Sequence, residues 1–195
     1  MPTRRDWLKG AAGLLLVRDA LAQGRIEPGV RRSSGEVRIS GERIVTGADG
    51  EVVFVVQQDA FLVRKQSEVS LVKTGLRILS GAVLSVFQPK QPKEIRTETA
   101  VIGIRGTGIY VEAEPARTYV CTCYGKSVLQ PIGDPASRET VRTVHHEQPR
   151  YIMAKGAPQM MMRAPVINHT DAELVFLESL LGREPPFGGK GFKPY

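Results

Sequence analysis

The residues of this chain best suited to chemistry are two cysteines and three histidines. Cys121 and Cys123 flank Thr122 within an apolar stretch that is typical of a β-strand. In a strand, side chains two positions apart point to the same face, which would place the two Cα atoms about 6–7 Å apart. Two thiolates on one face suit a soft transition metal ion, provided that a further ligand comes from elsewhere in the fold.

The three histidines are the candidates for that ligand: His145, His146 and His169. Adjacent residues in a strand face opposite ways, so only one of His145 and His146 is expected to reach the thiols. A metal site requires a histidine nitrogen within about 5 Å of both sulfur atoms. The methionines at 160–162 could add a thioether ligand for Cu(I), although methionine more often fills gaps in a core.

Other interpretations of these residues compete with a metal site. Cysteine is often buried simply as a small apolar residue. An oxidising compartment would allow a Cys121–Cys123 disulfide, but the geometry is strained between positions i and i+2 of an extended strand. His169 directly precedes a helix cap, where a residue commonly packs on the first helical turn. The Cys-x-Cys spacing is also not a standard zinc signature.

A catalytic interpretation has less support in the sequence. Cys123 and His146 could form a nucleophile and base, but no third residue is indicated that would orient them. The chain contains no glycine-rich phosphate loop, no H-E-x-x-H and no G-x-S-x-G motif. We therefore assign no catalytic residue and expect a protein that is not an enzyme.

The elements that must position these side chains are predicted to be short strands. From residue 36 to 130, alternating or continuous runs of aliphatic residues are separated by turn signals, and no helical period interrupts them. The run 52–56 is continuous and β-branched, which is typical of a strand buried on both faces. The expected fold is all-β, a roll, a solenoid or a sandwich of short strands, with one C-terminal α-helix.

The expected helix spans residues 171–181. Thr170 and Glu173 form a capping box, and Gly182 provides a stop. This helix lies in a C-terminal extension, residues 131–195, which ends in a tail rich in proline and glycine. We expect the helix to cover an open edge of the sheet.

Composition limits the classes of function. Only 6% of the 195 residues are aromatic, so the core must consist mainly of Val, Ile and Leu, which favour strands. The net charge is +7, but it is spread along the chain without a basic run. Aromatic residues are not interleaved with the bases as nucleic-acid stacking requires, and we expect no nucleic-acid partner.

The N-terminus resembles a twin-arginine export signal. Arg4 and Arg5 precede an apolar stretch at 10–17, and Ala20 and Ala22 form a small-residue cleavage site. The apolar stretch is shorter than the roughly 20 residues that span a bilayer, and no later segment could span one. The alternative is a cytosolic amphipathic helix. We expect residues 1–22 to be removed, residues 23–35 to be a linker, and the mature protein to be periplasmic. The twin-arginine route implies folding before export, often with a cofactor.

Residues 97–111 read TETAVIGIRGTGIYV, which resembles the T-P-x-A-x-x-x-x-R-G-T-x-F-x-V motif of the FecR family, with Glu98 in place of proline. Similar blocks at 41–46, 50–54, 59–63, 67–69 and 79–83 extend the resemblance over residues 36–130. It implies an extracytoplasmic β-rich domain. The founding members sense an outer-membrane iron transporter and regulate a sigma factor.

This chain departs from that plan, because a cleavable signal stands where the family has a cytoplasmic helical domain and a transmembrane helix. The resemblance therefore implies a binding or signalling module with an envelope or periplasmic protein as partner, without direct sigma-factor contact. Within the motif, Gly106 could serve a β-bulge and Arg105 could pair with a carboxylate. The alternative is that Arg105, Gly106 and Thr107 contact a ligand.

Overall fold

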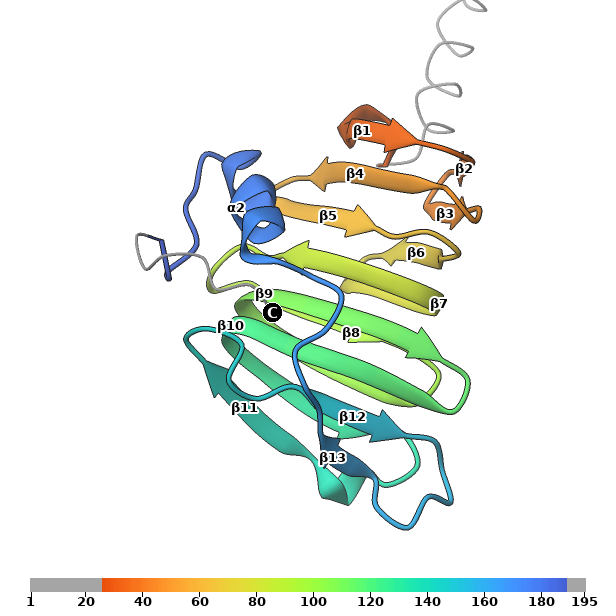
Figure 1. Cartoon of the computed structure of the whole chain (residues 1–195), viewed down its shortest axis with the longest axis vertical. Helices are drawn as coiled ribbons and strands as arrows, with labels where there is room; N and C mark the ends of the chain where they lie inside the picture. The colour runs from red at the N-terminus through yellow and green to blue at the C-terminus, as the bar shows by residue number, and fades with distance from the viewer. Residues whose placement is uncertain (1–25, 189–195) are drawn as a thin grey trace, which may run out of the picture.

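The computed structural model describes residues 26–188, which pair into one thirteen-stranded sheet (Figure 1). The strands are β1 (Val30–Ser34), β2 (Val37–Ser40), β3 (Arg43–Thr46), β4 (Glu51–Val56), β5 (Asp59–Val63), β6 (Glu68–Val72), β7 (Gly75–Val86), β8 (Pro92–Arg96), β9 (Ala100–Glu114), β10 (Arg117–Pro131), β11 (Glu139–Thr143), β12 (Arg150–Met153) and β13 (Met161–Arg163). Short 3-10 helices occupy Glu27–Gly29 (η1) and Pro135–Ser137 (η2), and the α-helix α2 spans Asp171–Ser179.

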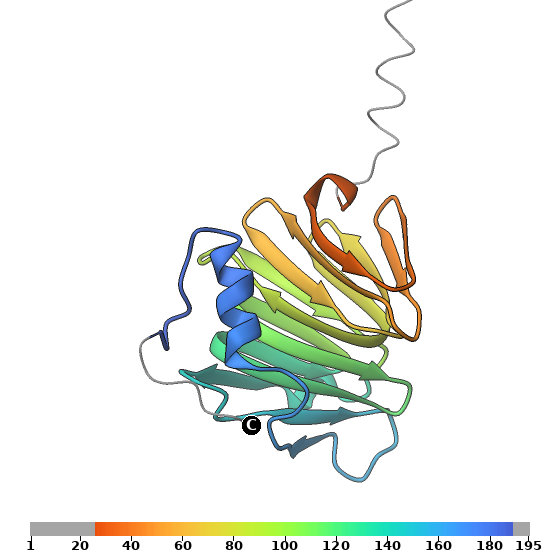
Figure 2. The same cartoon turned by 45° about the horizontal axis from the view of Figure 1, so that its top comes forward.

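The sheet folds into two layers because its three longest strands belong to both (Figure 2). The first layer runs β1-β4-β5-β7-β9-β10-β12-β13, and the second runs β2-β3-β6-β7-β8-β9-β10-β11. In β7, for example, residues 83–86 pair with β5 in the first layer, and residues 75–80 pair with β6 in the second. β9 and β10 are divided in the same way.

A glycine marks the change of layer in each long strand. Gly81, Gly106 and Gly125 have φ values of +81°, +60° and +92°, a region that favours residues without a Cβ. At Gly106 a Cβ atom would also approach the Cα of Pro89 to 2.8 Å. These glycines therefore let a continuous strand turn from one layer into the other.

The main hydrophobic core lies between the two layers. Its buried members are Ile26, Ile44, Val52, Phe54, Phe61, Val63, Val69, Leu71, Leu76, Ile78, Val83, Phe87, Ile95, Ala100, Ile102, Ile104, Ile109, Val111, Ala113, Val120, Leu129, Val141 and Ile152. We call these residues the inner core. Their aliphatic character agrees with the low aromatic content, and their burial accounts for most of the hydrophobic stabilisation of the fold.

A second cluster covers the opposite face of the first layer. Its buried members are Val53, Ala60, Leu62, Leu84, Val86, Tyr110, Tyr119, Cys121, Cys123, Tyr124, Leu174, Leu177 and Phe187. We call this face the outer face. Leu174, Leu177 and Phe187 come from the C-terminal segment, and α2 packs on β5 and β7. The run 52–56 is apolar because side chains of β4 are buried on both sides, as expected.

The helix begins as the sequence predicts. The Thr170 hydroxyl accepts a hydrogen bond from the Glu173 amide, and the Glu173 carboxylate accepts one from the Thr170 amide, which completes the capping box. Gly182 follows the last turn with φ of +65°. The regular helix ends at Ser179, two residues before the predicted end at 181.

The all-β prediction with one C-terminal helix is confirmed within residues 26–188. The predicted linker was wrong for residues 30–34, which form β1 on β4. The helix covers a face of the sheet instead of an edge, because Leu174 and Leu177 need an apolar surface. Arg4, Arg5, Ala20 and Ala22 lie outside the described residues. No helix between residues 26 and 188 has the length and apolarity that crossing a membrane requires.

Candidate functional site

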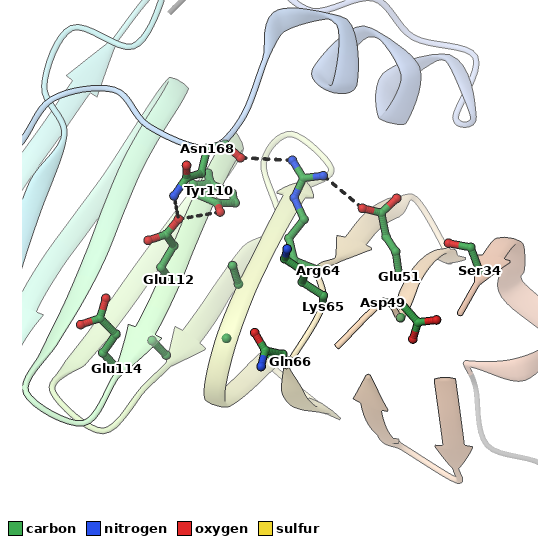
Figure 3. A pocket seen from close by; sticks show the side chains of 14 residues that line it. Ser34, Asp49, Glu51, Arg64, Lys65, Gln66, Tyr110, Glu112, Glu114 and Asn168 are labelled. Atoms are coloured by element: carbon green, nitrogen blue, oxygen red, sulfur yellow. Dashed lines mark hydrogen bonds and ion pairs between the residues drawn. The ribbon is translucent and has the colours of Figure 1, made fainter. Parts of the chain in front are cut away.

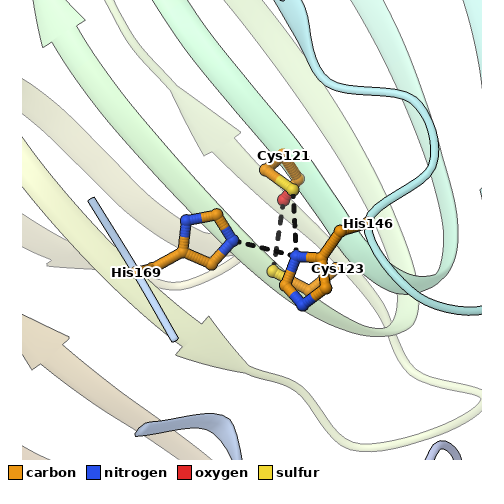
Figure 4. Close-up of side chains that lie close together, drawn as sticks. All are labelled: Cys121, Cys123, His146 and His169. Atoms are coloured by element: carbon orange, nitrogen blue, oxygen red, sulfur yellow. Dashed lines mark hydrogen bonds between the residues drawn. The ribbon is translucent and has the colours of Figure 1, made fainter. Parts of the chain in front are cut away.

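Four potential metal ligands converge on the outer face of β10 (Figure 4). Cys121 and Cys123 lie on β10, His146 lies in the bend after β11, and His169 directly precedes the cap of α2. One ligand atom from each residue lies within 4.8 Å of all the others. Both His146 and His169 therefore satisfy the requirement for a nitrogen within about 5 Å of both sulfurs.

The strand sets the direction of the two thiols. Val120 and Thr122 alternate with the cysteines, and Val120 belongs to the inner core, so Cys121 and Cys123 both point to the outer face. The Cys123 sulfur lies 3.6 Å from the Cys121 carbonyl oxygen. No disulfide joins the two cysteines, which are both free and buried.

Backbone contacts hold His146 against this strand. The His146 amide donates to the Cys123 carbonyl at 2.9 Å, and the Thr143 hydroxyl donates to the Thr122 carbonyl at 2.6 Å. His146 itself has φ of +59°, in the left-handed region. This bend turns its side chain toward the thiols, while His145 points to Asp171, so only one of the two adjacent histidines joins the cysteines.

On the side of each ring that points away from the thiols, His146 and His169 form a hydrogen bond that indicates which ring nitrogen carries the hydrogen atom. His169 Nδ1 lies 2.6 Å from the Ile167 carbonyl, and His146 Nε2 lies 3.1 Å from Asp171 Oδ1. A carbonyl and a carboxylate only accept hydrogen bonds, so both of these nitrogens must donate. In the neutral imidazoles, His146 Nδ1 and His169 Nε2 are consequently left with lone pairs.

Those two lone-pair nitrogens face each other at 3.0 Å, and the Cys121 sulfur lies 3.4 Å from His146 Nδ1. Two acceptors at that distance repel each other unless a cation, a proton or a metal ion, lies between them. In a tetrahedral zinc site the expected separations are about 3.3 Å between nitrogens and about 3.6 Å between nitrogen and sulfur, given the usual bond lengths. The observed pairs need to move by only a few tenths of an ångström.

Asp171 joins His146 to the third histidine. His145 Nε2 lies 2.8 and 2.9 Å from the two carboxylate oxygens of Asp171, which also meets His146. Asp171 is the first residue of α2, where the helix dipole favours a negative charge. A carboxylate that holds the outer N–H of a metal-binding histidine is the usual second layer of a metal site.

The pKa values of three buried groups in the site are shifted from their ordinary values. Burial opposes ionisation of Cys121, but hydrogen bonding with Cys123, and with His146 and His169 when a proton lies between the two imidazoles, holds the pKa of this thiol well below its usual value. Burial and the neighbouring Cys121 raise the pKa of Cys123. Burial lowers the pKa of His146, but Cys121 and Asp171 outweigh it and raise that pKa overall. The negative charge thus gathers on Cys121, as a soft cation requires.

The cluster is closed to large molecules. Cys121 and Cys123 are 0% exposed, and His146 and His169 are 3% exposed. The Tyr110 ring stacks on His169 with centroids 4.6 Å apart. Cys121, His146 and Asp171 do form a nucleophile–base–carboxylate sequence, which differs from the predicted Cys123–His146 pair, but their burial prevents contact with an organic substrate. A metal ion is small enough to occupy this buried site, whereas an organic substrate is not.

The structure also has a surface pocket, whose lining side chains are drawn in Figure 3. Its volume is about 750 Å³, and Arg64, Tyr110, Glu112 and Asn168 are among the residues that line it. Neither thiol borders this pocket. Two of the residues that line the pocket also adjoin His169: Tyr110 stacks on its ring, and Asn168 directly precedes it.

Two of the three methionines have surroundings that the structure defines. Met161 packs against the inner core, which lies on the other side of the first layer from the thiols. Met162 is 42% exposed on β13, the strand at the end of that layer. The residue that the sequence analysis missed is Asp171, which it considered only as part of the helix start. The sequence did contain a signal for this role, because Asp171 lies only two positions after the candidate ligand His169.

Arg105, Gly106 and Thr107 are not members of this cluster, and two of the three make contacts within the sheet. Gly106 lies where the pairing of β9 with β10 shifts register, as predicted for a bulge. Thr107 is buried and donates from its hydroxyl to the Lys126 carbonyl at 3.0 Å. Arg105 is exposed, and no carboxylate among residues 26–188 forms an ion pair with it, contrary to one of the two expectations.

Comparison with known proteins gives a fold but no family. No family model and no curated protein matches the sequence. Two crystal structures, each described as a putative anti-sigma factor from Parabacteroides distasonis, share the fold. The first has a TM-score of 0.54 at 11% identity over 70% of this chain and 64% of its own. The second has a TM-score of 0.53 at 11% identity over 71% of this chain and 73% of its own.

This chain thus spans less than two thirds of the first of these structures. At 11% identity the similarity concerns the arrangement of the strands and not the residues of the site. The comparison therefore shows a shared β-rich fold alone, and the chemistry of this chain depends on the cluster itself.

Proposed function

We propose that this protein binds a zinc-class ion through Cys121, Cys123, His146 and His169. The observation that carries the proposal is the convergence of four buried donor atoms, two sulfurs and two nitrogens, within 4.8 Å of one another, with the two nitrogens 3.0 Å apart. One metal ion among them would bind all four donor atoms, in place of the proton that otherwise joins the two nitrogens. An S₂N₂ donor set in tetrahedral arrangement favours Zn²⁺ among common divalent ions.

The coordination sphere supports a binding role instead of a catalytic one. Four protein ligands complete a tetrahedron and leave no open position for water or substrate, whereas catalytic zinc sites keep one open. The burial of all four residues excludes exchange with larger ligands. We therefore infer a non-enzymatic protein that holds its ion as part of the folded structure.

Metal analysis of the purified full-length protein tests this proposal. We expect about one equivalent of Zn²⁺, and a Co²⁺-substituted form with the visible absorption of a tetrahedral thiolate site. The Cys121→Ala/Cys123→Ala double variant should lose both. Val120→Ala is the matched control, because Val120 lies on the same strand but faces the inner core. It should keep the ion.

The proposal fails if the wild-type protein folds normally but binds neither Zn²⁺ nor Co²⁺. Binding of Cu(I) alone would overturn the assignment to zinc. Retention of the thiolate–cobalt absorption in the double variant would show that the ion lies elsewhere.

We further propose that the chain is an exported FecR-like binding or signalling module of the cell envelope. The shared fold with structures described as a putative anti-sigma factor supports a regulatory role, and the motif at 97–111 and the Arg4–Arg5 signal support the family and the compartment. Cell fractionation tests export: an Arg4→Lys/Arg5→Lys variant should remain in the cytoplasm with residues 1–22 attached. Periplasmic recovery of this variant would contradict the twin-arginine route. Crosslinking in the periplasm, followed by purification, would identify the partner.

A further inference from the structure

We propose that the bound ion is a clasp, which fastens the C-terminal segment to the sheet and so controls whether the outer face is covered. This inference rests on the proposed zinc site and adds its regulation. We define the C-terminal strap as residues 164–188, which follow β13 and include α2. Figure 1 shows the strap crossing the first layer before it continues into the helix.

The metal site joins two parts of the chain that are distant in sequence. Cys121 and Cys123 lie on β10, and His146 is bound to the same strand through the Cys123 carbonyl. His169 and the supporting carboxylate of Asp171 both belong to the strap. An ion held by all four ligands therefore connects the strap to the body at the point where α2 begins.

Several other polar contacts of this part of the strap are partly exposed (Figure 3). Asn168 Nδ2 donates to Glu112 Oε1 at 2.7 Å, and Arg64 donates to the Asn168 carbonyl at 3.2 Å and to Glu173 at 2.7 Å. The side chains of Arg64 and Glu173 are 22% and 27% exposed. Partly exposed ion pairs contribute little to stability, so they position the strap more than they secure it.

Apolar contacts secure the helical part of the strap. Leu174 and Leu177 are 0% exposed and pack in the outer-face cluster, and Phe187 lies against Tyr124 with ring centroids 5.8 Å apart. Without the ion, the hydrogen bond between His146 and His169 takes the place of four metal–ligand bonds at this junction. The ion therefore strengthens the attachment of the strap to the sheet.

Opening of the strap would expose a defined apolar surface. The outer-face residues beneath it include Val53, Leu62, Leu84, Tyr110 and Tyr119. The Tyr119 hydroxyl donates to the Pro165 carbonyl at 2.9 Å in the closed form, so the cover extends from the helix to the start of the strap. A metal-free protein would expose this face more often than a metal-loaded one.

Hydrogen exchange on the full chain, with and without one equivalent of Zn²⁺, tests the clasp. We expect the amides of α2 to exchange at least about tenfold more slowly with Zn²⁺, while the amides of β6 and β8, which lie in the second layer, change much less. Equal exchange of α2 in the two states, with Zn²⁺ shown to be bound, would overturn the clasp and leave the zinc site standing. Failure to bind Zn²⁺ at all would overturn both.

A second test measures the effect in the opposite direction, with a substitution in the strap that leaves all four metal ligands unchanged. If the ion tightens the strap, then strap contacts tighten the ion by the same factor. Leu177→Ala should therefore weaken Zn²⁺ affinity about fivefold or more. Ile78→Ala, which removes an equally buried side chain from the inner core, is the matched control and should leave the affinity unchanged.

Equal Zn²⁺ affinities for the wild-type protein and Leu177→Ala would contradict the clasp, because the helix would then be uncoupled from the ion. A loss of affinity in Ile78→Ala as large as in Leu177→Ala would do the same, since general destabilisation would then explain both.

Discussion

The two faces of the first layer use the same strands for different purposes. Along β10, Val120 faces the inner core, whereas Cys121 and Cys123 face outward beside two histidines. The inner core consists of aliphatic residues and phenylalanines. The outer face contains tyrosines, thiols and imidazoles. The period of two in a strand keeps packing and chemistry apart while placing them one residue from each other.

The faces also differ in what covers them. The inner face is closed by the second layer, which is continuous with the first through β7, β9 and β10. The outer face is closed by the C-terminal strap, whose sole α-helix among residues 26–188 is nine residues long. One face is therefore sealed by the sheet itself, and the other by a segment that can be released without unfolding the sheet.

The largest expected effect lies on the inner face. Phe61 stacks on Phe54 with centroids 4.8 Å apart and meets Phe87 edge-on at 5.6 Å. Phe61→Ala should lower the free energy of unfolding by about 3–5 kcal/mol, because it leaves a cavity among buried rings. Urea denaturation measures this loss. The folded variant should still bind one equivalent of Zn²⁺, and loss of the ion from folded protein would show that the two faces are not independent.

The turn between layers should be the next most sensitive feature. Gly106→Ala forces a Cβ into the left-handed region and toward the Cα of Pro89, at an expected cost of about 1–3 kcal/mol in unfolding free energy. Gly103→Ala is the control on the same strand, because its Cβ would find no atom nearer than 3.8 Å. Equal urea midpoints for the two variants would contradict a conformational role for the motif glycine.

An effect confined to the outer face is expected from Asp171→Asn. The asparagine keeps the volume but removes the charge that holds His146 and His145. Zn²⁺ affinity should fall about 10- to 100-fold, the usual range for a residue that supports a metal-binding histidine. Competition with a chelator measures the affinity. Thermal unfolding of the metal-free variant should remain close to that of the metal-free wild type, and a large loss there would indicate a structural role instead.

Local sequence patterns predicted the direction of the two thiols and the start of the helix. The period of two in strands placed Cys121 and Cys123 on one face, and the capping box placed the start of α2. The position of His146 was not predictable in the same way. It depends on a left-handed bend and on an amide bond to Cys123, which are tertiary features.

Two further differences between the sequence predictions and the structure, at β1 and at Asp171, also arise from tertiary contacts. β1 lies within a polar stretch, and only its pairing with β4 makes it a strand. The role of Asp171 depends on where α2 docks, which no local signal specifies. Local preferences thus indicate the elements and the direction of their side chains, whereas the packing of distant segments decides which side chains meet.

The smallest expected effect distinguishes docking of the strap from formation of its helix. Thr170→Ala removes the hydroxyl that caps α2, which should cost about 1 kcal/mol, while Thr170→Ser keeps a capping hydroxyl and should cost little. Because Thr170 lies between His169 and Asp171, a weaker cap should loosen α2 in hydrogen exchange and lower Zn²⁺ affinity slightly, with no effect on the inner core. Faster exchange in the β-strands of the second layer would contradict this, since it would mean that the cap stabilises the sheet and not the detachable segment.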